Sequence, residues 1–250
     1  MDGYPPIPTR RERSDDFSAS LHTDDPIRMT AASIDTTAAT SAQVPLPRRI
    51  AMVLATMTIA TVFYLAINTY PLRQPRLLPL TFVDEWIGWQ AWTIWPYWLL
   101  LFTGPALLLS IRERNLLLAT LRAYAIAMSL NAAIWLAWPT RMLRSGLPEG
   151  MDPFTAFAWH CLYALDDVNN CFPSGHITIP AVVAVGAGLQ YPRARPWIWL
   201  TLIALAPSVI STGQHYAWDI AGGLATATIG LLLAGVPLWR PGAAPLLQPQ

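Results

Sequence analysis

Two histidine-containing segments in the second half of the chain combine residue types that could transfer a phosphoryl group. The first is "PSGH" at residues 173–176, and the second is "HYAWD" at residues 215–219; each lies at the start of an apolar run. His215 and Asp219 are four residues apart, which would place them on one face of the last helix if that helix starts at His215. A carboxylate that accepts from one imidazole nitrogen leaves the other free as acceptor or nucleophile. The structural alternative is a His–Asp pair that only joins two helices.

The residues of "PSGH" suit the start of a helix that binds an anion. Pro173 can begin a helix and Ser174 can cap one. Gly175 would let a ligand approach the backbone closely, and the free N–H groups of a helix start suit phosphate. His176 would then lie beside the phosphate as a proton donor. The structural alternative is a capped helix with an interfacial histidine.

Arginine and amide side chains near these segments could bind phosphoryl oxygens. Arg141 and Arg144 lie in "WPTRMLR" (138–144), and Gln214 directly precedes His215. Guanidinium groups are planar donors that match phosphate oxygens. We expect these three residues, with Ser174 and Gly175, to form the substrate-binding set. For the arginines, a loop position or lipid headgroups are the alternative.

The remaining candidate ligands favour neither a metal nor another cofactor. Cys161 and Cys171, the only two cysteines, cannot form a tetrahedral zinc site alone. They could instead form a disulfide that braces the segment leading to Ser174, or remain two free thiols. Asp166 and Asp167 are the best metal candidate, but successive side chains usually point apart. We expect a solvated or capping role for them, and no metal.

The composition predicts the elements that must position these residues. The chain is 54% hydrophobic and 12% charged and contains 12 Trp, which indicates a polytopic membrane protein. A spanning helix needs about 20 mostly apolar residues, and in lipid such runs must be helical. The sequence therefore predicts an all-α bundle of six transmembrane helices, with apolar runs near 50–69, 93–111, 116–138, 172–192, 196–213 and 217–236.

The polar composition of residues 1–45 predicts a disordered cytoplasmic tail, because such a segment buries too little surface to offset the entropy of ordering. It does not resemble a signal peptide, since the first apolar run begins near Ile50, too late and too long. The six-helix membrane domain is expected at 46–240 and a short tail at 241–250.

Arginine placement predicts the orientation in the membrane. All 16 basic residues are arginine, and with a cytoplasmic amino terminus most of those near the helix ends fall inside, as the positive-inside rule requires. The inner set is Arg48, Arg49, Arg112, Arg114, Arg193, Arg195 and Arg240; the outer set is Arg73, Arg76, Arg141 and Arg144. The loops 70–92 and 139–171 and the turn near 214–216 then face outward. All three polar clusters therefore meet on the extracytoplasmic side of a plasma or inner membrane.

The tryptophan positions and the net charge indicate a membrane and a lipid as partners, and not nucleic acid. Trp86, Trp89, Trp92 and Trp95 are spaced as an interfacial belt, with an in-plane amphipathic segment. A site at the outer headgroup level favours a lipid phosphate or phospholipid as substrate. The net charge of +1 gives no argument for nucleic acid.

Over about residues 80–236 the chain resembles the type 2 phosphatidic acid phosphatase and haloperoxidase superfamily. The family pattern is Lys, six residues, Arg-Pro; then Pro-Ser-Gly-His; then Ser-Arg, five residues, His, three residues, Asp. The second motif matches in full at 173–176, and Ser208, His215 and Asp219 fit the third. Its arginine position holds Val209, and the first motif cannot be complete because the chain has no lysine; Arg141 is its nearest remnant.

The segments "TGQHYAWDIAGG" and "LPLTFVDEW", which contains Asp84, look more like the inositolphosphotransferase-like branch, which includes sphingolipid head-group transferases. The resemblance implies that His215 attacks phosphorus to form a phosphohistidine while Asp219 orients its ring. His176 would protonate the leaving oxygen and then activate water or an alcohol. Cationic side chains and helix ends would supply the charge without a metal.

Several functions remain open at this point. Water as acceptor would make the protein a phosphatase, and a lipid or inositol hydroxyl would make it a phosphotransferase. A non-catalytic membrane transporter or scaffold with the same fold is the alternative, favoured by the missing Lys and Arg. The resemblance disfavours a vanadium-dependent haloperoxidase, because those proteins are soluble and have a richly cationic anion site, and this chain has neither feature.

Overall fold

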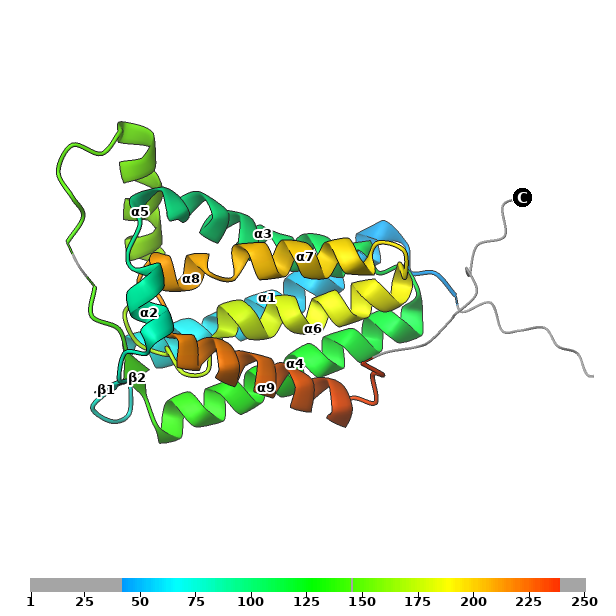
Figure 1. Cartoon of the computed structure of the whole chain (residues 1–250). Helices are drawn as coiled ribbons and strands as arrows, with labels where there is room; N and C mark the ends of the chain where they lie inside the picture. Colours follow the sequence, from blue (N-terminus) through cyan, green and yellow to red (C-terminus); the bar gives the residue numbers. More distant parts are fainter. Residues whose placement is uncertain (1–41, 145, 239–250) are drawn as a thin grey trace, which may run out of the picture. The chain divides into compact units, whose positions relative to one another are not determined.

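The computed structural model describes residues 42–144 and 146–238, which are mostly helical (Figure 1). The predicted carboxy-terminal tail and residues 1–41 of the predicted amino-terminal tail lie outside these ranges. The elements in chain order are α1 (Leu46–Thr69), β1 (Arg76–Leu77), α2 (Phe82–Ile87), η1 (Ala91–Thr93), α3 (Ile94–Ser110), α4 (Arg114–Ala137), β2 (Thr140–Arg141), α5 (Pro153–Leu165), α6 (Gly175–Gln190), α7 (Arg195–Leu205), α8 (Ser208–Ser211) and α9 (Ala217–Leu233).

All six predicted apolar runs contain helices, but not all of them are long. Three helical segments are long and apolar enough to cross a membrane: Leu46–Thr69, Ala91–Ser110 and Arg114–Ala137. The other three are shorter apolar helices: Gly175–Gln190, Arg195–Ser211 and Ala217–Leu233. Two causes shorten them. The motif residues 172–174 precede α6 instead of extending it, and Pro207 lies at the break between α7 and α8. The chain is therefore compatible with a membrane protein, with three candidate spans in the described part.

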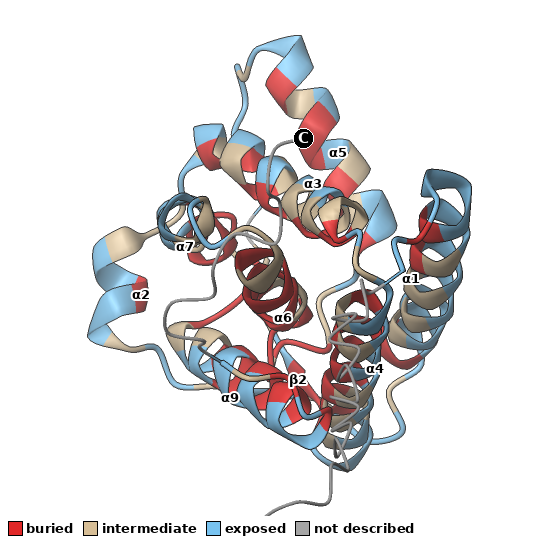
Figure 2. Cartoon of the chain, turned by 90° about the vertical axis from the view of Figure 1, so that its right-hand side faces the viewer, coloured by how far each residue is buried: buried red, intermediate tan, exposed pale blue. Residues whose placement is uncertain are grey.

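Helix α6 forms the centre of the bundle. Twelve of its 16 residues are buried, and it packs against α3, α4, α7 and α9 (Figure 2). Small and β-branched residues make up most of this helix, so its neighbours can approach closely on every side. Whatever is attached to the start of α6 is consequently held from all directions.

Helix α1 packs on α3 and α4 at the edge of the bundle and buries only four residues (Figure 2). Its remaining surface is mostly apolar, and three other helices also expose large apolar side chains. The exposed apolar side chains include Leu54, Ile59, Val62 and Phe63 on α1, Leu99 and Phe102 on α3, Trp197, Leu200 and Ile203 on α7, and Leu224, Ile229, Leu232 and Leu233 on α9. Apolar surface of this extent is typical of contact with lipid or another protein.

One end of the bundle carries several short elements (Figure 1). Strands β1 and β2 pair in parallel, with Arg76 opposite Thr140 and Leu77 opposite Arg141. Helix α5 lies inside the segment predicted as a loop, 139–171; its start is capped by Asp152, whose carboxylate accepts from the N–H groups of Phe154 and Thr155. Helices α6 and α9 begin at this same end. The loops between α3 and α4 and between α6 and α7 lie at the other (Figure 1).

The predicted tryptophan belt is largely exposed at the end with the short elements. Trp86, Trp92 and Trp95 are exposed, whereas Trp89 packs on Trp159 with ring centroids 5.3 Å apart. Helix α2 buries only Asp84 and exposes Glu85 together with apolar side chains, Phe82 among them.

Candidate active site

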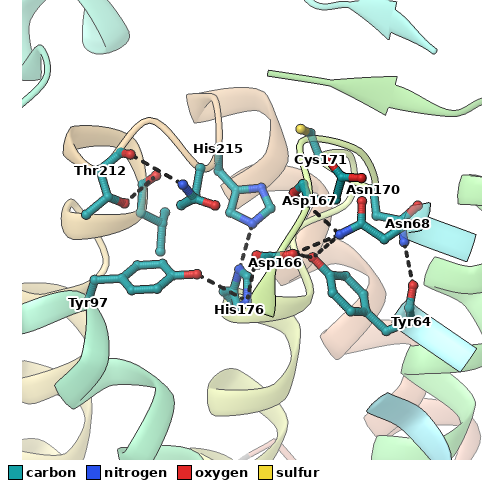
Figure 3. A network of polar contacts seen from close by, with 12 residues as sticks. Tyr64, Asn68, Tyr97, Asp166, Asp167, Asn170, Cys171, His176, Thr212 and His215 are labelled. Carbon is teal, nitrogen blue, oxygen red and sulfur yellow. Dashed lines mark hydrogen bonds and ion pairs between the residues drawn. The ribbon is translucent and has the colours of Figure 1, made fainter. Parts of the chain in front are cut away.

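Two histidine rings, one at the start of α6 and one in the turn before α9, meet at the end of the bundle that carries α2 and α5. Nδ1 of His176, at the start of α6, lies 2.9 Å from Nε2 of His215, just before α9 (Figure 3). The ring centroids are 5.1 Å apart and the planes are inclined at 67°. The two segments singled out in the sequence therefore form one site, although 39 residues separate the histidines.

The hydrogen bonds assign the tautomers of both rings. Asp219 Oδ2 accepts from Nδ1 of His215 at 3.2 Å and from the backbone N–H of Tyr216 at 2.8 Å. Because a carboxylate only accepts, Nδ1 of His215 carries a proton, and in the neutral ring Nε2 is an acceptor. His176 must then donate through Nδ1. The potential nucleophile, Nε2 of His215, is covered by His176, so a phosphoryl group can reach it only if the rings separate.

Backbone contacts fix His215 in place. The carbonyl of Val209 accepts from the N–H groups of both Gln214 and His215, at 3.1 and 3.0 Å. Val209 is fully buried in the apolar core, so the position where the family pattern has arginine holds no cation. The backbone at this position holds the histidine loop, and the side chain serves packing.

Two glycines allow α9 to approach the "PSGH" segment. A Cβ on Gly223 would lie 2.7 Å from the carbonyl oxygen of Ser174, and one on Gly222 would lie 2.5 Å from the ring of Phe172. The N–H of Ser174 also donates to the carbonyl oxygen of Asp219 at 3.0 Å. Without side chains at these two positions, the starts of α6 and α9 can come close enough for the histidines to meet.

The prediction that the Ser174 side chain caps α6 is wrong. Ser174 occupies the N-cap position, but its hydroxyl makes no capping bond and has no hydrogen-bond partner among the described residues. A Cβ on Gly175 would face Trp135 at 3.6 Å, an ordinary contact, and the approach of a ligand to this backbone stays a prediction. The buried, unpaired hydroxyl of Ser174 remains suited to a ligand oxygen, whereas the Cβ direction of Gly175 points to the bundle interior.

The two candidate arginines lie in different environments. Arg144 donates to Oε1 of Gln214 at 2.9 Å and to the carbonyl of Asp167 at 3.1 Å, and its guanidinium lies 4.5 Å from the ring centre of Tyr163. Its Nε is buried and unpaired among the described residues. Arg144 and Gln214 are thus joined beside the histidines, and the buried Nε–H of Arg144 is available to a ligand.

Arg141, on β2, is exposed. Burial raises the pKa of Tyr216 to about 12, and the charge of Arg141 acts weakly in the opposite direction. The guanidinium therefore influences the start of α9, but it makes no hydrogen bond to a described side chain.

A second buried carboxylate lies on the other side of His176. Asp166 Oδ2 is 3.9 Å from Nε2 of His176, and Oδ1 accepts from the Tyr64 hydroxyl at 2.6 Å and the Asn68 amide at 2.8 Å (Figure 3). The Tyr97 hydroxyl lies 3.4 Å from the same His176 nitrogen. The carboxylate of Asp166 is therefore buried and hydrogen-bonded instead of solvated, while the backbone of Asp166 forms the C-cap of α5.

Asp167, its neighbour, is exposed and accepts from its own following N–H, that of Val168. Within residues 42–144 and 146–238, no three His, Cys, Asp or Glu side chains gather as metal ligands.

The disulfide considered between Cys161 and Cys171 is not formed, because both are free cysteines. Cys161 lies on α5, whereas Cys171 is buried and its thiol donates to the carbonyl of Val168 at 3.3 Å. Burial raises the pKa of the Cys171 thiol, and the charges of Asp219 and Asp166 act in the same direction. The segment before Ser174 is held by hydrogen bonds, including one from the Phe172 N–H to the Thr140 hydroxyl at 2.7 Å.

Sequence reasoning missed three polar residues of the site: Tyr64, Asn68 and Tyr97. Asn68, at the end of the first apolar run, is a polar residue within a spanning segment, which is a signal for function by itself. It also missed the role of Asp84, whose Oδ1 accepts from the N–H of Ala217, the first residue of α9, at 2.7 Å. The other oxygen of this carboxylate accepts from the backbone and hydroxyl of Thr81.

The fold and the site define a helical protein, compatible with a membrane location, in which an Asp–His–His chain lies at one end of a bundle. The family model of the PAP2 superfamily matches residues 91–233, more than half of the chain. The chain belongs to the PAP2 superfamily, and this membership supports a phosphatase-type lipid phosphoesterase. A search of curated proteins found no match.

Proposed function

We propose that the protein is an integral membrane enzyme that transfers or hydrolyses the phosphate ester of a lipid through a phosphohistidine on His215. The observation that carries the proposal is the continuous chain from Asp219 to His215 at 3.2 Å and from His215 to His176 at 2.9 Å. A carboxylate-oriented imidazole with an unprotonated Nε2 is a suitable nucleophile, and a second imidazole within reach can serve as acid and base.

The reaction would proceed in two balanced steps. Nε2 of His215 attacks phosphorus, and the bond to the leaving oxygen breaks as that oxygen takes a proton from His176. His176 then removes a proton from water or an alcohol, whose oxygen attacks phosphorus and releases His215. Asp219 holds the Nδ1 proton of His215 throughout and stabilises the positive charge that develops on its ring.

The charges near the histidines favour a phosphodiester substrate over a phosphomonoester. Arg144 is the cation hydrogen-bonded within the site, while two carboxylates, Asp219 and Asp166, lie next to the rings. A phosphomonoester near neutral pH carries about −1.5 to −2 charge, whereas a diester carries a single negative charge. One guanidinium, helped by the Gln214 amide and the Ser174 hydroxyl, matches the smaller charge. This supports the head-group transferase branch suggested by the sequence.

The exposed apolar faces of α1, α3, α7 and α9 support a bundle that crosses the bilayer with six helices, the shorter three among them. The arginine distribution supports a cytoplasmic amino terminus and a site at the extracytoplasmic surface. In that orientation the exposed side chains of α2 lie at the level of the lipid headgroups. The substrate would enter laterally from the outer leaflet.

The test is turnover by the purified protein in detergent with a chelator of divalent metals. The panel contains phosphatidic acid and several diester phospholipids, each with and without inositol as an alcohol, and lipid mass spectrometry identifies the products. His215→Ala should abolish turnover. His160→Ala is the matched control, since His160 is exposed on α5. If His215→Ala retains the wild-type rate on every lipid that is turned over, the proposal fails.

A further inference from the structure

Each of the two histidines has a carboxylate next to it. Asp219 binds Nδ1 of His215, and Asp166 Oδ2 lies 3.9 Å from Nε2 of His176. The side chains of His176 and Asp166 are only 17% and 11% exposed, so bulk water screens this pair little. The second pairing has no counterpart in the three sequence motifs considered above.

General acid catalysis by His176 requires a proton on each of its nitrogens. The neutral ring carries a proton on Nδ1, which it donates to His215 at 2.9 Å. A neutral imidazole cannot release that proton to a leaving oxygen, because it would become an anion. The reactive form is therefore the imidazolium, and its second proton lies on Nε2, facing Asp166 and the Tyr97 hydroxyl at 3.4 Å.

Asp166 is held in place by residues outside the segment that matches the family model. Tyr64 and Asn68, both on α1, donate to Oδ1 at 2.6 and 2.8 Å and leave Oδ2 toward His176. The matching segment begins at residue 91, so α1 and these two donors lie outside the matched residues. Burying a carboxylate is costly, and these hydrogen bonds reduce that cost without using the oxygen near the ring.

We propose that Asp166 is a positioning residue for His176: its carboxylate pairs with the Nε2 proton of the ring and stabilises the imidazolium that protonates the leaving oxygen. The inference rests on the proposed function, because it assigns a partner to the acid of that reaction. Asp166 does not itself exchange a proton. After the first step His176 is neutral, and the pair re-forms when the ring takes the proton of the acceptor.

Other titratable groups near His176 and Asp166 also influence the pH dependence of this pair. These groups are His215 just before α9, Asp219 in its first turn, Tyr97 on α3, Tyr64 on α1, Cys171 in the loop before α6 and Arg144 in the loop after β2. Arg144 and a protonated His215 disfavour the imidazolium of His176. Among these groups Asp219 is the other carboxylate, and its Oδ2 is already bonded to His215.

The unfolding temperature of an Asp166 variant distinguishes a positioning role of this carboxylate from a purely structural one. Burial raises the pKa of Asp166, although hydrogen bonds from Tyr64 and Asn68 and the charges of His215 and Arg144 act in the opposite direction. For a raised pKa, the contribution to stability is complete below the unfolded value of about 3.9 and is lost as the pH rises through the folded value. Asp166→Asn, which is neutral and similar in shape, should therefore unfold at the same or a higher temperature at pH 7.

The experiment measures kcat against pH for Asp166→Asn, with Asp167→Asn as the control for a neighbouring, exposed carboxylate. Loss of the carboxylate should move the alkaline limb of the Asp166→Asn profile about one pH unit lower, as expected for a charge within about 4–6 Å. Asp167→Asn should keep the wild-type limb, because its side chain does not contact His176. Asp166→Glu should restore part of the shift.

An unchanged alkaline limb in Asp166→Asn, with the variant folded, overturns the inference. So does a shift that appears in Tyr97→Phe but not in Asp166→Asn, because the hydroxyl would then be the partner of Nε2. Either result leaves the proposed function intact as long as His215→Ala is inactive. Wild-type turnover by His215→Ala would instead reject the proposed function and this inference with it.

Discussion

The carbonyl oxygen of Ser174 lies so close to Gly223 that a Cβ on this glycine would be 2.7 Å away. This contact brings the start of α6 against the first turns of α9, and the two histidines are carried by those two segments. The approach of the helices and the geometry of the site are thus consequences of the same small residue. A larger residue at position 223 must push the segments apart.

Gly223→Ala should consequently lower both stability and activity. Forcing a methyl group against a backbone oxygen in a packed interior costs about 1–3 kcal/mol, which thermal unfolding in detergent would detect. Gly104→Ala on α3 is the control, because its Cβ would lie 3.5 Å from Ile179, an ordinary contact. Equal unfolding temperatures for the two variants would contradict the role of the close approach.

Asp84 should affect catalysis from outside the family segment. Asp84→Ala removes the acceptor for the N–H of Ala217, and loss of such a helix-start bond costs about 1 kcal/mol of stability. Because His215 lies two residues before Ala217, we also expect kcat to fall on the order of 10-fold. Glu85→Gln, an exposed change on the same helix, should do neither. Wild-type kcat in a folded Asp84→Ala variant would show that α2 does not position α9.

The two arginines should differ in their importance. Arg144→Gln removes the cation bonded to Gln214, and loss of such a donor near developing negative charge costs about 100-fold in kcat. Arg141→Gln should cost less, because this side chain is exposed and acts only at longer range. Arg76→Gln, an exposed arginine at the same end of the bundle, provides the baseline. A larger loss for Arg141→Gln than for Arg144→Gln would reverse the assignment.

The cysteines should react as two thiols of unequal accessibility. In denaturant without reductant, an alkylating reagent should add to both cysteines, as counted by mass spectrometry. In the folded protein Cys161 should react first, since Cys171 is 1% exposed and burial raises its pKa. If the denatured protein is alkylated only after reduction, the two cysteines form a disulfide and this prediction is wrong.

The sequence predicted the parts of the site that rest on local patterns. The apolar runs located the helices, and the four-residue spacing of His215 and Asp219 predicted that their side chains meet. They do meet, although His215 lies in the turn before α9 and not on a face of that helix. The positions that it misjudged depend on contacts between distant residues. Asp166 is joined to Tyr64 and Asn68 across about 100 residues, and no local pattern specifies that approach. Helix α5 could have been predicted from local sequence, because Asp152 followed by Pro153 is a typical helix start.

The choice between Arg141 and Arg144 was also beyond the reach of the sequence. The two residues are three positions apart, and both follow the same helix, α4. Arg141 pairs through its backbone with β1 and with Asn169, so its side chain stays at the surface. Arg144 follows this strand and turns back toward Gln214. The short β1–β2 pairing thus decides which guanidinium reaches the histidines.

The central claim is that His215 carries the phosphoryl group, and direct labelling tests it. The His176→Ala variant is given a phosphate ester with a nitrophenyl leaving group, which needs no acid to depart, so the second step becomes slow. Peptide mass spectrometry after an alkaline quench should then find an acid-labile phosphate on His215, and His176→Ala combined with His215→Ala should carry none. Phosphate on another residue, or the same labelling in the double variant, would contradict the account.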